Sequence, residues 1–224
     1  GGYSYLDDFE STQNSIDLLN PFPWNLASTP YDDSPTALFP EASKVNDIDY
    51  GKNRALMAWY YVDGIFMRKN SRSLPKNITK DDLSNHFVRA IQTTELFPNR
   101  DVGVNENNLI SALNVAFYPN ERGPYNLDAD RVNSDGTLQE PQKRWGGIMR
   151  KIDQVDFETA NIEYIEFWLM DPFVYSGPTA EGGDLYFNLG DVSEDILKDE
   201  KKFFENGLPV DGDMSKVDTT VWGK

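Results

Sequence analysis

Apolar residues along this chain gather in short runs that are separated by long polar connections. The runs have the length and the aromatic and β-branched content of strands. They cover residues 3–9, 24–28, 55–62, 109–118, 145–152, 162–170 and 185–189. The run at 55–62 is nearly continuous in apolar residues, which is typical of a strand covered on both faces. The pattern therefore predicts a chain built mainly of strands.

Two of the runs alternate with the period of two residues that separates the faces of a strand. In the runs at 162–170 and 185–189, three large apolar residues follow one another at every second position. These apolar faces consist of Ile165, Phe167 and Leu169 in the first run and of Leu185, Phe187 and Leu189 in the second.

Helical patterns interrupt the strands at two places. The first helix is expected over 80–96, where Thr79 and Asp82 have the spacing of a capping box, Ile78 can pack on Leu83, and an apolar stripe follows. The second is expected to begin at Ser193, as a cap of the free backbone N–H groups, and to close at Gly207.

Strands outnumber helices and do not alternate with them, which favours an antiparallel β-sandwich with two or so peripheral helices over a doubly wound sheet. We expect residues 1–224 to form a single domain of this kind. The polar stretch near 119–143 is expected to be a long insertion loop within it, because the apolar runs on either side belong to one core.

The net charge of the chain and its residue composition exclude several classes of function. Lysine and arginine total 21 against 37 aspartates and glutamates, so the formal net charge is −16 and nucleic acid is excluded as a partner. No apolar run approaches the ~20 residues of a membrane-spanning helix. Cysteine is absent, which excludes disulfides, thiolate catalysis and cysteine-based zinc sites.

Two acidic stretches are candidates for calcium. Residues 128–136 have the outline of a calcium loop, but Arg131 stands where an oxygen ligand is needed, so a solvated loop with a turn at Asp135 and Gly136 is favoured. The cluster of Asp7, Asp8 and Glu10 can supply oxygens to a structural calcium ion. Metal residues therefore stay unassigned, and no other cofactor is expected.

Candidate catalytic residues give no coherent site. Glycoside hydrolysis needs paired carboxylates across a cleft, and neither Glu163 with Glu166 nor Asp153 with Asp156 meets this requirement. The single histidine, His86, has no nucleophile motif beside it and is expected on a helix surface. The sequence thus predicts a protein that is not an enzyme, with no catalytic residues and no cofactor-binding residues.

Aromatic residues leave one alternative open. Such side chains can stack on sugars, although core packing is their commoner use. The candidates for a sugar platform are Trp24, Trp59, Tyr60, Tyr61, Trp145 and Trp168.

Several longer stretches of the sequence resemble segments of known protein families. Residues 7–10 and 24–30 resemble the opening of jelly-roll domains that are similar to galactose-binding modules, and 161–173 is similar to the strand that crosses their core. More narrowly, four motifs resemble the SprA/Sov family, the outer-membrane translocon of the type IX secretion system and gliding motility in Bacteroidetes. They lie at 144–150, 162–173, 183–195 and 217–223.

This resemblance implies a jelly-roll domain that was cut from a much larger barrel protein. Its expected function is non-enzymatic, as a structural or gating part of the translocon, and the alternative is a carbohydrate-binding module on the cell surface. The implied partners are the barrel, its accessory outer-membrane proteins and secreted cargo, with a saccharide kept open. The implied location is a soluble domain at the outer membrane, on the extracellular side by preference and otherwise on the periplasmic side.

Overall fold

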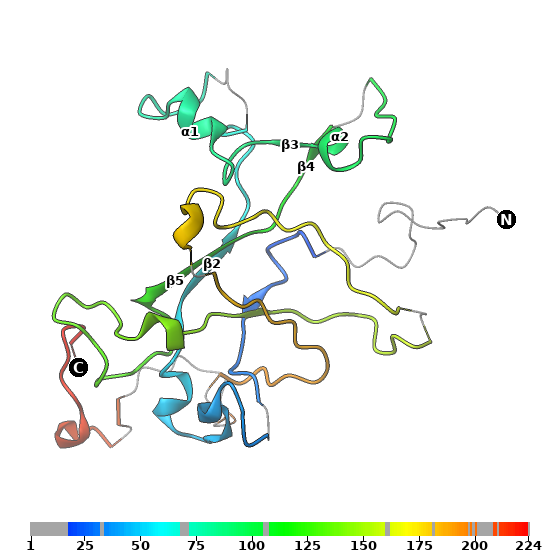
Figure 1. Cartoon of the computed structure of the whole chain (residues 1–224). Coiled ribbons are helices and arrows are strands. Elements are labelled where there is room, and N and C mark those ends of the chain that lie inside the picture. Colours follow the sequence, from blue (N-terminus) through cyan, green and yellow to red (C-terminus); the bar gives the residue numbers. More distant parts are fainter. Residues whose placement is uncertain are drawn as a thin grey trace.

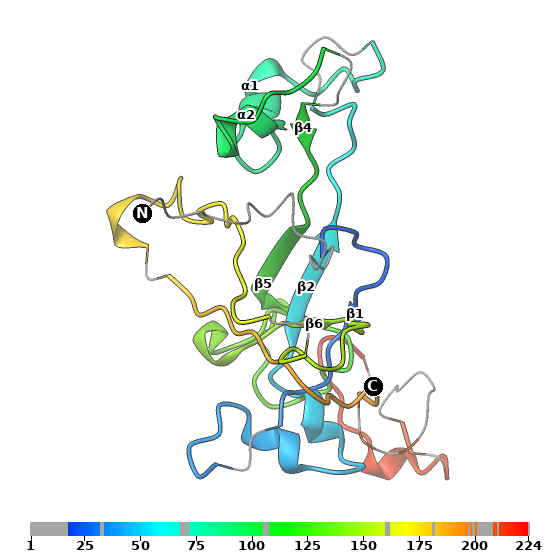
Figure 2. The same cartoon turned by 90° about the vertical axis from the view of Figure 1, so that its right-hand side faces the viewer.

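The computed structural model describes residues 18–31, 34–67, 72–104, 108–159, 162–180, 182–196, 198, 200, 208–209 and 211–223. A two-stranded ribbon runs through the middle of the molecule (Figure 1). Two short α-helices lie at one end of it and a group of 3₁₀ turns at the other (Figure 2). The predicted strand at 3–9 and the acidic cluster of Asp7, Asp8 and Glu10 fall outside the described residues.

The central ribbon pairs β2 (Ala55–Tyr60) with β5 (Asn114–Arg122) in antiparallel fashion. Leu56 lies opposite Tyr118, and the register shifts between Ala55 and Leu56, where Arg122 becomes the partner. Both strands follow the predicted runs at 55–62 and 109–118. The sequence therefore placed the ribbon correctly, although the second run is divided.

Two further pairs are very short. β1 (Asn25–Leu26) pairs with β6 (Ile148–Met149), and β3 (Ile91–Gln92) pairs with β4 (Leu109–Ile110), both antiparallel. The remaining regular elements are helical turns. They are η1 (Pro40–Ser43), η2 (Ile48–Gly51), α1 (Lys80–Ser84), α2 (Thr93–Leu96), η3 (Pro141–Lys143), η4 (Gly177–Thr179) and η5 (Met214–Lys216).

The expected fold class is confirmed at the level of strand type. Strands outnumber α-helices among the described residues, and all three strand pairs are antiparallel. The pairs do not join into larger sheets within the described chain, so the structure gives separate ribbons where the sequence predicted the two layers of a sandwich.

The prediction of one helix over 80–96 is wrong beyond its first turn. The capping box is present as predicted: Asp82 N donates to Thr79 Oγ1 over 3.2 Å, and Thr79 N donates to Asp82 Oδ2 over 2.8 Å. α1 then ends at Ser84, because Asn85 turns to a ψ of 134° and its side chain accepts from Phe87 N over 2.9 Å. An asparagine that binds the backbone in this way competes with the helical hydrogen bonds.

The predicted helix from Ser193 is also absent from the described residues. Ser193 Oγ does accept from Asp195 N over 3.2 Å, as a cap would. However, Lys198 and Glu200 have left-handed φ angles of 54° and 64°, which a right-handed helix does not accommodate. Gly207, the predicted end of this helix, lies outside the described residues.

The runs at 162–170 and 185–189 do not form strands in the described structure. Ile162 N donates to Phe157 O over 2.8 Å, and no backbone–backbone hydrogen bond joins 163–172 or 182–192 to any other described residue. Leu185, Phe187 and Leu189 were expected to face inward, yet each is more than half exposed. An alternating pattern of apolar and polar residues indicates the two faces of a strand. It does not show which neighbouring strand would form hydrogen bonds with it.

The buried centre lies beside the ribbon and is partly polar. Its apolar members among the described residues are Ala42, Tyr50, Ala55, Leu138 and Trp145, whereas Leu83 is buried separately on α1. The stretch near 119–143, expected as a polar insertion, begins as β5 and then contributes Asn126, Asp128 and Leu138 to this centre. Here the loop is a structural part of the molecule.

Gly123 provides a test of this packing. A Cβ atom at this position would lie 2.4 Å from Ala55 O, so the backbone would have to move. We expect Gly123→Ala to lower the free energy of unfolding by about 2 kcal/mol in urea denaturation. Gly64→Ala is the matched control, because nothing lies within 4 Å of its Cβ position. Equal stability of the two variants would contradict the close approach.

Candidate functional site

Arg54 lies at the start of the central ribbon with its side chain fully enclosed. The residue has no exposed surface, its Nη1 donates to Ala27 O over 2.6 Å, and its guanidinium lies 4.5 Å from the ring centre of Trp145. Burial lowers the pKa of Arg54 to about 10, so the group is still charged at neutral pH. Its Nε and Nη2 are buried without a hydrogen-bond partner among the described residues, so the Trp145 ring is the other contact that offsets the cost of burying this charge.

Arg144 is the second enclosed guanidinium. Its Nη1 donates to Asp128 Oδ2 over 2.9 Å and to Lys52 O over 2.6 Å, and its Nε donates to Gln139 O over 3.0 Å. The Arg144 side chain has no exposed surface and that of Asp128 has 5%. One side chain therefore joins its own loop, through Asp128 and Gln139, to Lys52, which lies 92 positions earlier in the sequence.

Asp128 uses its two oxygens differently. Oδ1 accepts from the backbone N–H groups of Asp130 and Arg131, both over 3.3 Å, and so shapes its own loop. Oδ2 accepts the charge of Arg144 and also lies 2.8 Å from Arg131 Nη2. Burial raises the pKa of Asp128, but the Arg144 hydrogen bond and the Arg131 charge outweigh it, so the pKa is lowered overall.

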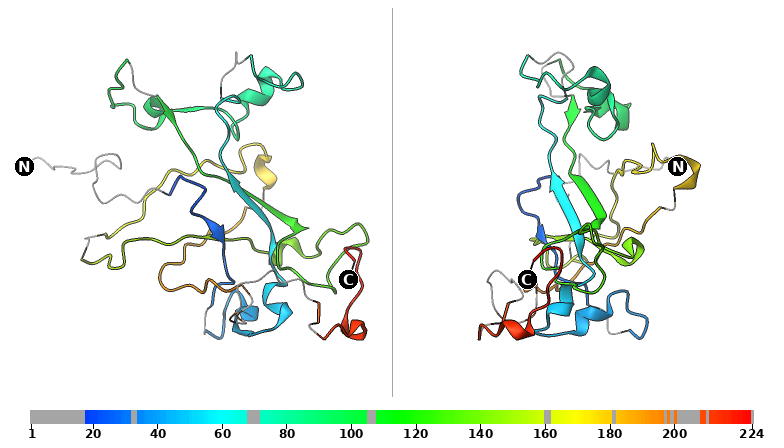
Figure 3. Two further views of the ribbon diagram at one scale, coloured as in Figure 1. Left: turned by 180° about the vertical axis from the view of Figure 1, so that it is seen from behind. Right: turned by 90° about the vertical axis from the view of Figure 1, so that its left-hand side faces the viewer.

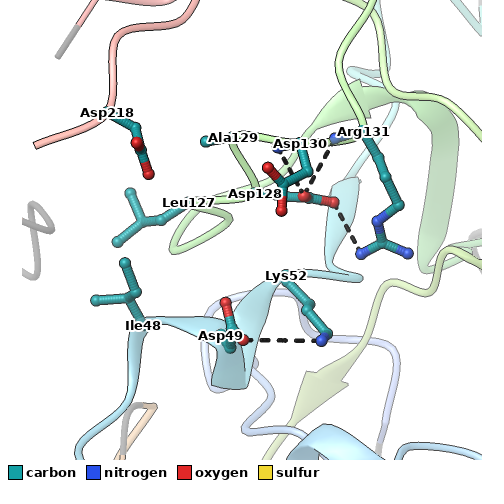
Figure 4. A pocket seen from close by; sticks show the side chains of 9 residues that line it. All are labelled: Ile48, Asp49, Lys52, Leu127, Asp128, Ala129, Asp130, Arg131 and Asp218. Carbon is teal, nitrogen blue, oxygen red and sulfur yellow. Dashed lines mark hydrogen bonds and ion pairs between the residues drawn. The ribbon is translucent and has the colours of Figure 1, made fainter.

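A polar pocket of about 190 Å³ opens beside this ion pair (Figure 4). It lies between η2 and the loop at 127–131, with Asp218 on the far rim. Its lining residues are Ile48, Asp49, Lys52, Leu127, Asp128, Ala129, Asp130, Arg131 and Asp218.

The side chains of the pocket lining that can ionise are carboxylates, one lysine and one arginine. The lowered pKa of Asp128 keeps this carboxylate ionised, which excludes it as a general acid at neutral pH. Asp49 and Lys52 face each other over 3.8 Å, and the arrangement amounts to structural ion pairing.

The calcium-like loop at 128–136 contains the predicted turn and begins with a residue of the buried ion pair. The turn at Asp135 and Gly136 is confirmed: Gly136 N donates to Asn133 O over 3.0 Å, and Asp135 accepts from Thr137 N over 3.0 Å. The loop is not solvated throughout, because Asp128 is buried against Arg144. Across the part of the chain that the structure describes, no three acidic or histidine residues gather to hold a metal ion.

The other predicted site residues stay apart. Glu163, Glu166, Asp153 and Asp156 are all exposed, and Asp156 is engaged by the Thr159 hydroxyl over 2.6 Å. His86 is exposed just after α1, where its Nδ1 accepts from Arg89 Nε over 3.2 Å. No acid–base pair results from these positions.

The aromatic residues proposed as a sugar platform are scattered. Trp145 is buried beneath Arg54, and Trp24 donates through its indole N–H to Leu18 O over 3.0 Å. Tyr60, Tyr61 and Trp168 are exposed, and no ring contact joins any two of the proposed residues within the described ranges.

A more prominent surface feature is a pair of exposed apolar segments, residues 164–175 and 185–192. They flank η4, the short gold coil in Figure 1. Contiguous exposed apolar surface on a folded domain marks a place of contact with another surface. The exposed side chains are Tyr164, Ile165, Phe167, Trp168, Leu169, Met170, Phe173, Val174, Tyr175, Leu185, Tyr186, Phe187, Leu189 and Val192.

Sequence reasoning missed the two buried arginines. Arg54 directly precedes the apolar run at 55–62, and Arg144 directly precedes Trp145. A cation at the border of an apolar run is the one signal that could have indicated them, and it is weak because such cations usually point into solvent.

The comparisons with known proteins add no relative. Neither the protein-family models nor the curated proteins give a match to this chain. Within the described ranges, none of the helices has the length and apolar character to cross a membrane.

The Asp128–Arg144 pair gives a prediction with a defined pH dependence. The Asp128 pKa is lower in the folded state than its ordinary value of 3.8, so the pair stabilises the fold above that value. This stability is lost as the pH falls through the folded pKa. We expect Asp128→Asn to lower the free energy of unfolding by about 3 kcal/mol at neutral pH, because a buried cation loses its partner.

The difference between wild type and Asp128→Asn should shrink as the pH falls below about 4. Urea denaturation at several pH values measures it. Asp130→Asn is the control, since Asp130 is exposed on the same loop, and we expect a change within about 0.5 kcal/mol. A pH-independent difference would show that Asp128 acts without its charge.

Proposed function

We propose that this chain is a non-enzymatic structural or gating domain of an outer-membrane protein-secretion translocon of the SprA/Sov type. The observation that carries the proposal is the exposure of the two apolar segments, 164–175 and 185–192. A domain that exposes so much aromatic and aliphatic surface is suited to contact with other protein surfaces. Its partners would be the barrel, accessory outer-membrane proteins and passing cargo.

The position of the family motifs supports this reading. The motifs at 162–173 and 183–195 cover most of both exposed segments. The motif at 217–223 packs at another place: Trp222 Nε1 donates to Gly136 O over 2.9 Å, and Arg122 lies 4.4 Å from its ring centre. Figure 3 shows this last segment beside the loop at 123–140. The motifs therefore include both contact surface and internal support.

The jelly-roll assignment belongs to the same proposal. It requires the runs at 162–170 and 185–189 to join sheets with the β2–β5 ribbon in the intact parent protein. The location at the outer membrane, on the extracellular side by preference and otherwise in the periplasm, follows from the same resemblance.

Secretion by the full-length parent protein tests the proposal. We expect the double substitution Leu169→Asp and Leu185→Asp to reduce cargo release about tenfold, because two charges in an apolar contact would cost at least ~1.4 kcal/mol of binding. Both side chains are more than half exposed, so folding should be unaffected.

The control for this test is Val155→Asp, at a residue that is 93% exposed outside the two segments. All variants should reach the outer membrane in equal amounts. Unimpaired secretion by the double variant would overturn the proposed contact function.

Carbohydrate binding is the second candidate, and the exposure of Trp168 and Tyr186 favours it. Titration calorimetry with neutral oligosaccharides distinguishes the two functions. A carbohydrate-binding module should give saturable heat that Trp168→Ala reduces by at least about tenfold, since each lost aromatic stacking contact removes roughly 1–3 kcal/mol. Absence of heat across a broad glycan set would leave only the translocon function.

A further inference from the structure

The two apolar segments already touch at one point. The rings of Phe167 and Phe187 have their centroids 5.1 Å apart at an angle of 54°. This separation is within the range of aromatic neighbours that lie side by side on one face of a sheet. Each of the two residues is also the midpoint of an alternating run, 165–169 in one segment and 185–189 in the other.

The contact fits an antiparallel register. With Phe167 opposite Phe187, Ile165 lies opposite Leu189 and Leu169 opposite Leu185. All three pairs are apolar and share one face, because they are spaced by two residues in both runs. On the other face, this register pairs Glu166 with Asn188 and Trp168 with Tyr186, so one polar pair lies next to one aromatic pair.

Neighbouring side chains in the first run already have separate partners. Phe167 contacts Phe187, whereas Trp168 packs edge-on against Phe97 at the end of α2, with centroids 6.4 Å apart and planes at 89°. The chain is held again at Tyr175, whose hydroxyl oxygen accepts from His86 N over 2.9 Å. The segment is therefore held by contacts of Trp168 and Tyr175 in addition to the contact with the second run.

We propose that 165–169 and 185–189 are the two strands of one antiparallel β-hairpin, in the register set by Phe167 and Phe187. Each run supplies the backbone hydrogen-bonding partner that the other lacks in the described structure. The inference deepens the proposed function, because it gives the form in which the exposed segments would meet a partner. It does not depend on the secretion role.

The connection between the runs is compatible with a hairpin. It is long, at residues 170–184, but the entropy of closing a loop rises only slowly with its length. It also contains turns that reverse the chain: Asp171 Oδ1 accepts from Phe173 N over 2.8 Å, Ser176 N donates to Phe173 O over 2.8 Å, and η4 follows. An isolated two-stranded hairpin is only marginally stable, so the ladder is expected to form transiently until the apolar face is covered.

Cysteine trapping tests the register, and the chain has no cysteine that would interfere. The test variant is Glu166→Cys with Asn188→Cys in the full 224-residue chain, which places two thiols directly opposite on the polar face. The control is Glu166→Cys with Asp184→Cys, which places them four residues out of register on the same face. A disulfide needs Cα atoms within about 7 Å, so brief formation of the ladder traps only the first pair.

We expect the test pair to close an intramolecular disulfide at least tenfold faster than the control under mild oxidation. Non-reducing electrophoresis and peptide mass spectrometry measure it. Equal rates for the two pairs would overturn the register, and disulfide-linked dimers would assign the runs to a sheet between molecules instead. Because the readout is the crosslink, failure here leaves the secretion test intact, and failure of the secretion test leaves the hairpin intact.

Discussion

The structure depends on enclosing two guanidinium groups in an interior that has few apolar residues. Arg54 and Arg144 have no exposed side-chain surface, and most of their hydrogen-bond acceptors are backbone carbonyl oxygens. Such carbonyls lie in the right places only if the loops that carry them follow one path. The irregular segments around residues 27, 52 and 139 are therefore fixed by the arginines, and Asp128 supplies the buried carboxylate that pairs with Arg144.

The local signals in the sequence predicted local structure well. The run at 55–62 is β2, and the Thr79–Asp82 capping box starts a helix at the predicted residue. The apolar stripe that followed did not extend the helix, because Asn85 uses its side chain to hold the next turn. Periodicity describes which face of an element is apolar, whereas a single polar side chain decided where this element ends.

The candidate site was harder to predict from the sequence than the local elements, because its contacts form only in the folded chain. Arg131 argued against a calcium loop at 128–136, but its contact with Asp128 depends on Asp128 being buried, which only the folded chain establishes. Likewise, the runs at 162–170 and 185–189 have the residue pattern of strands. A strand also needs a partner strand, and the pattern does not identify one. Predictions failed where the outcome depended on residues far away in the sequence.

The indole of Trp222 joins the last described segment to Gly136, across 86 positions of the chain. Arg122 lies against the same ring, so this one side chain touches the loop that surrounds the buried arginines from two directions. A pull on the polypeptide near residue 223 would therefore be transmitted to the interior through a hydrogen bond and a cation–π contact before any strand separates. In a protein that experiences force, this indole would act as the first mechanical link to give way.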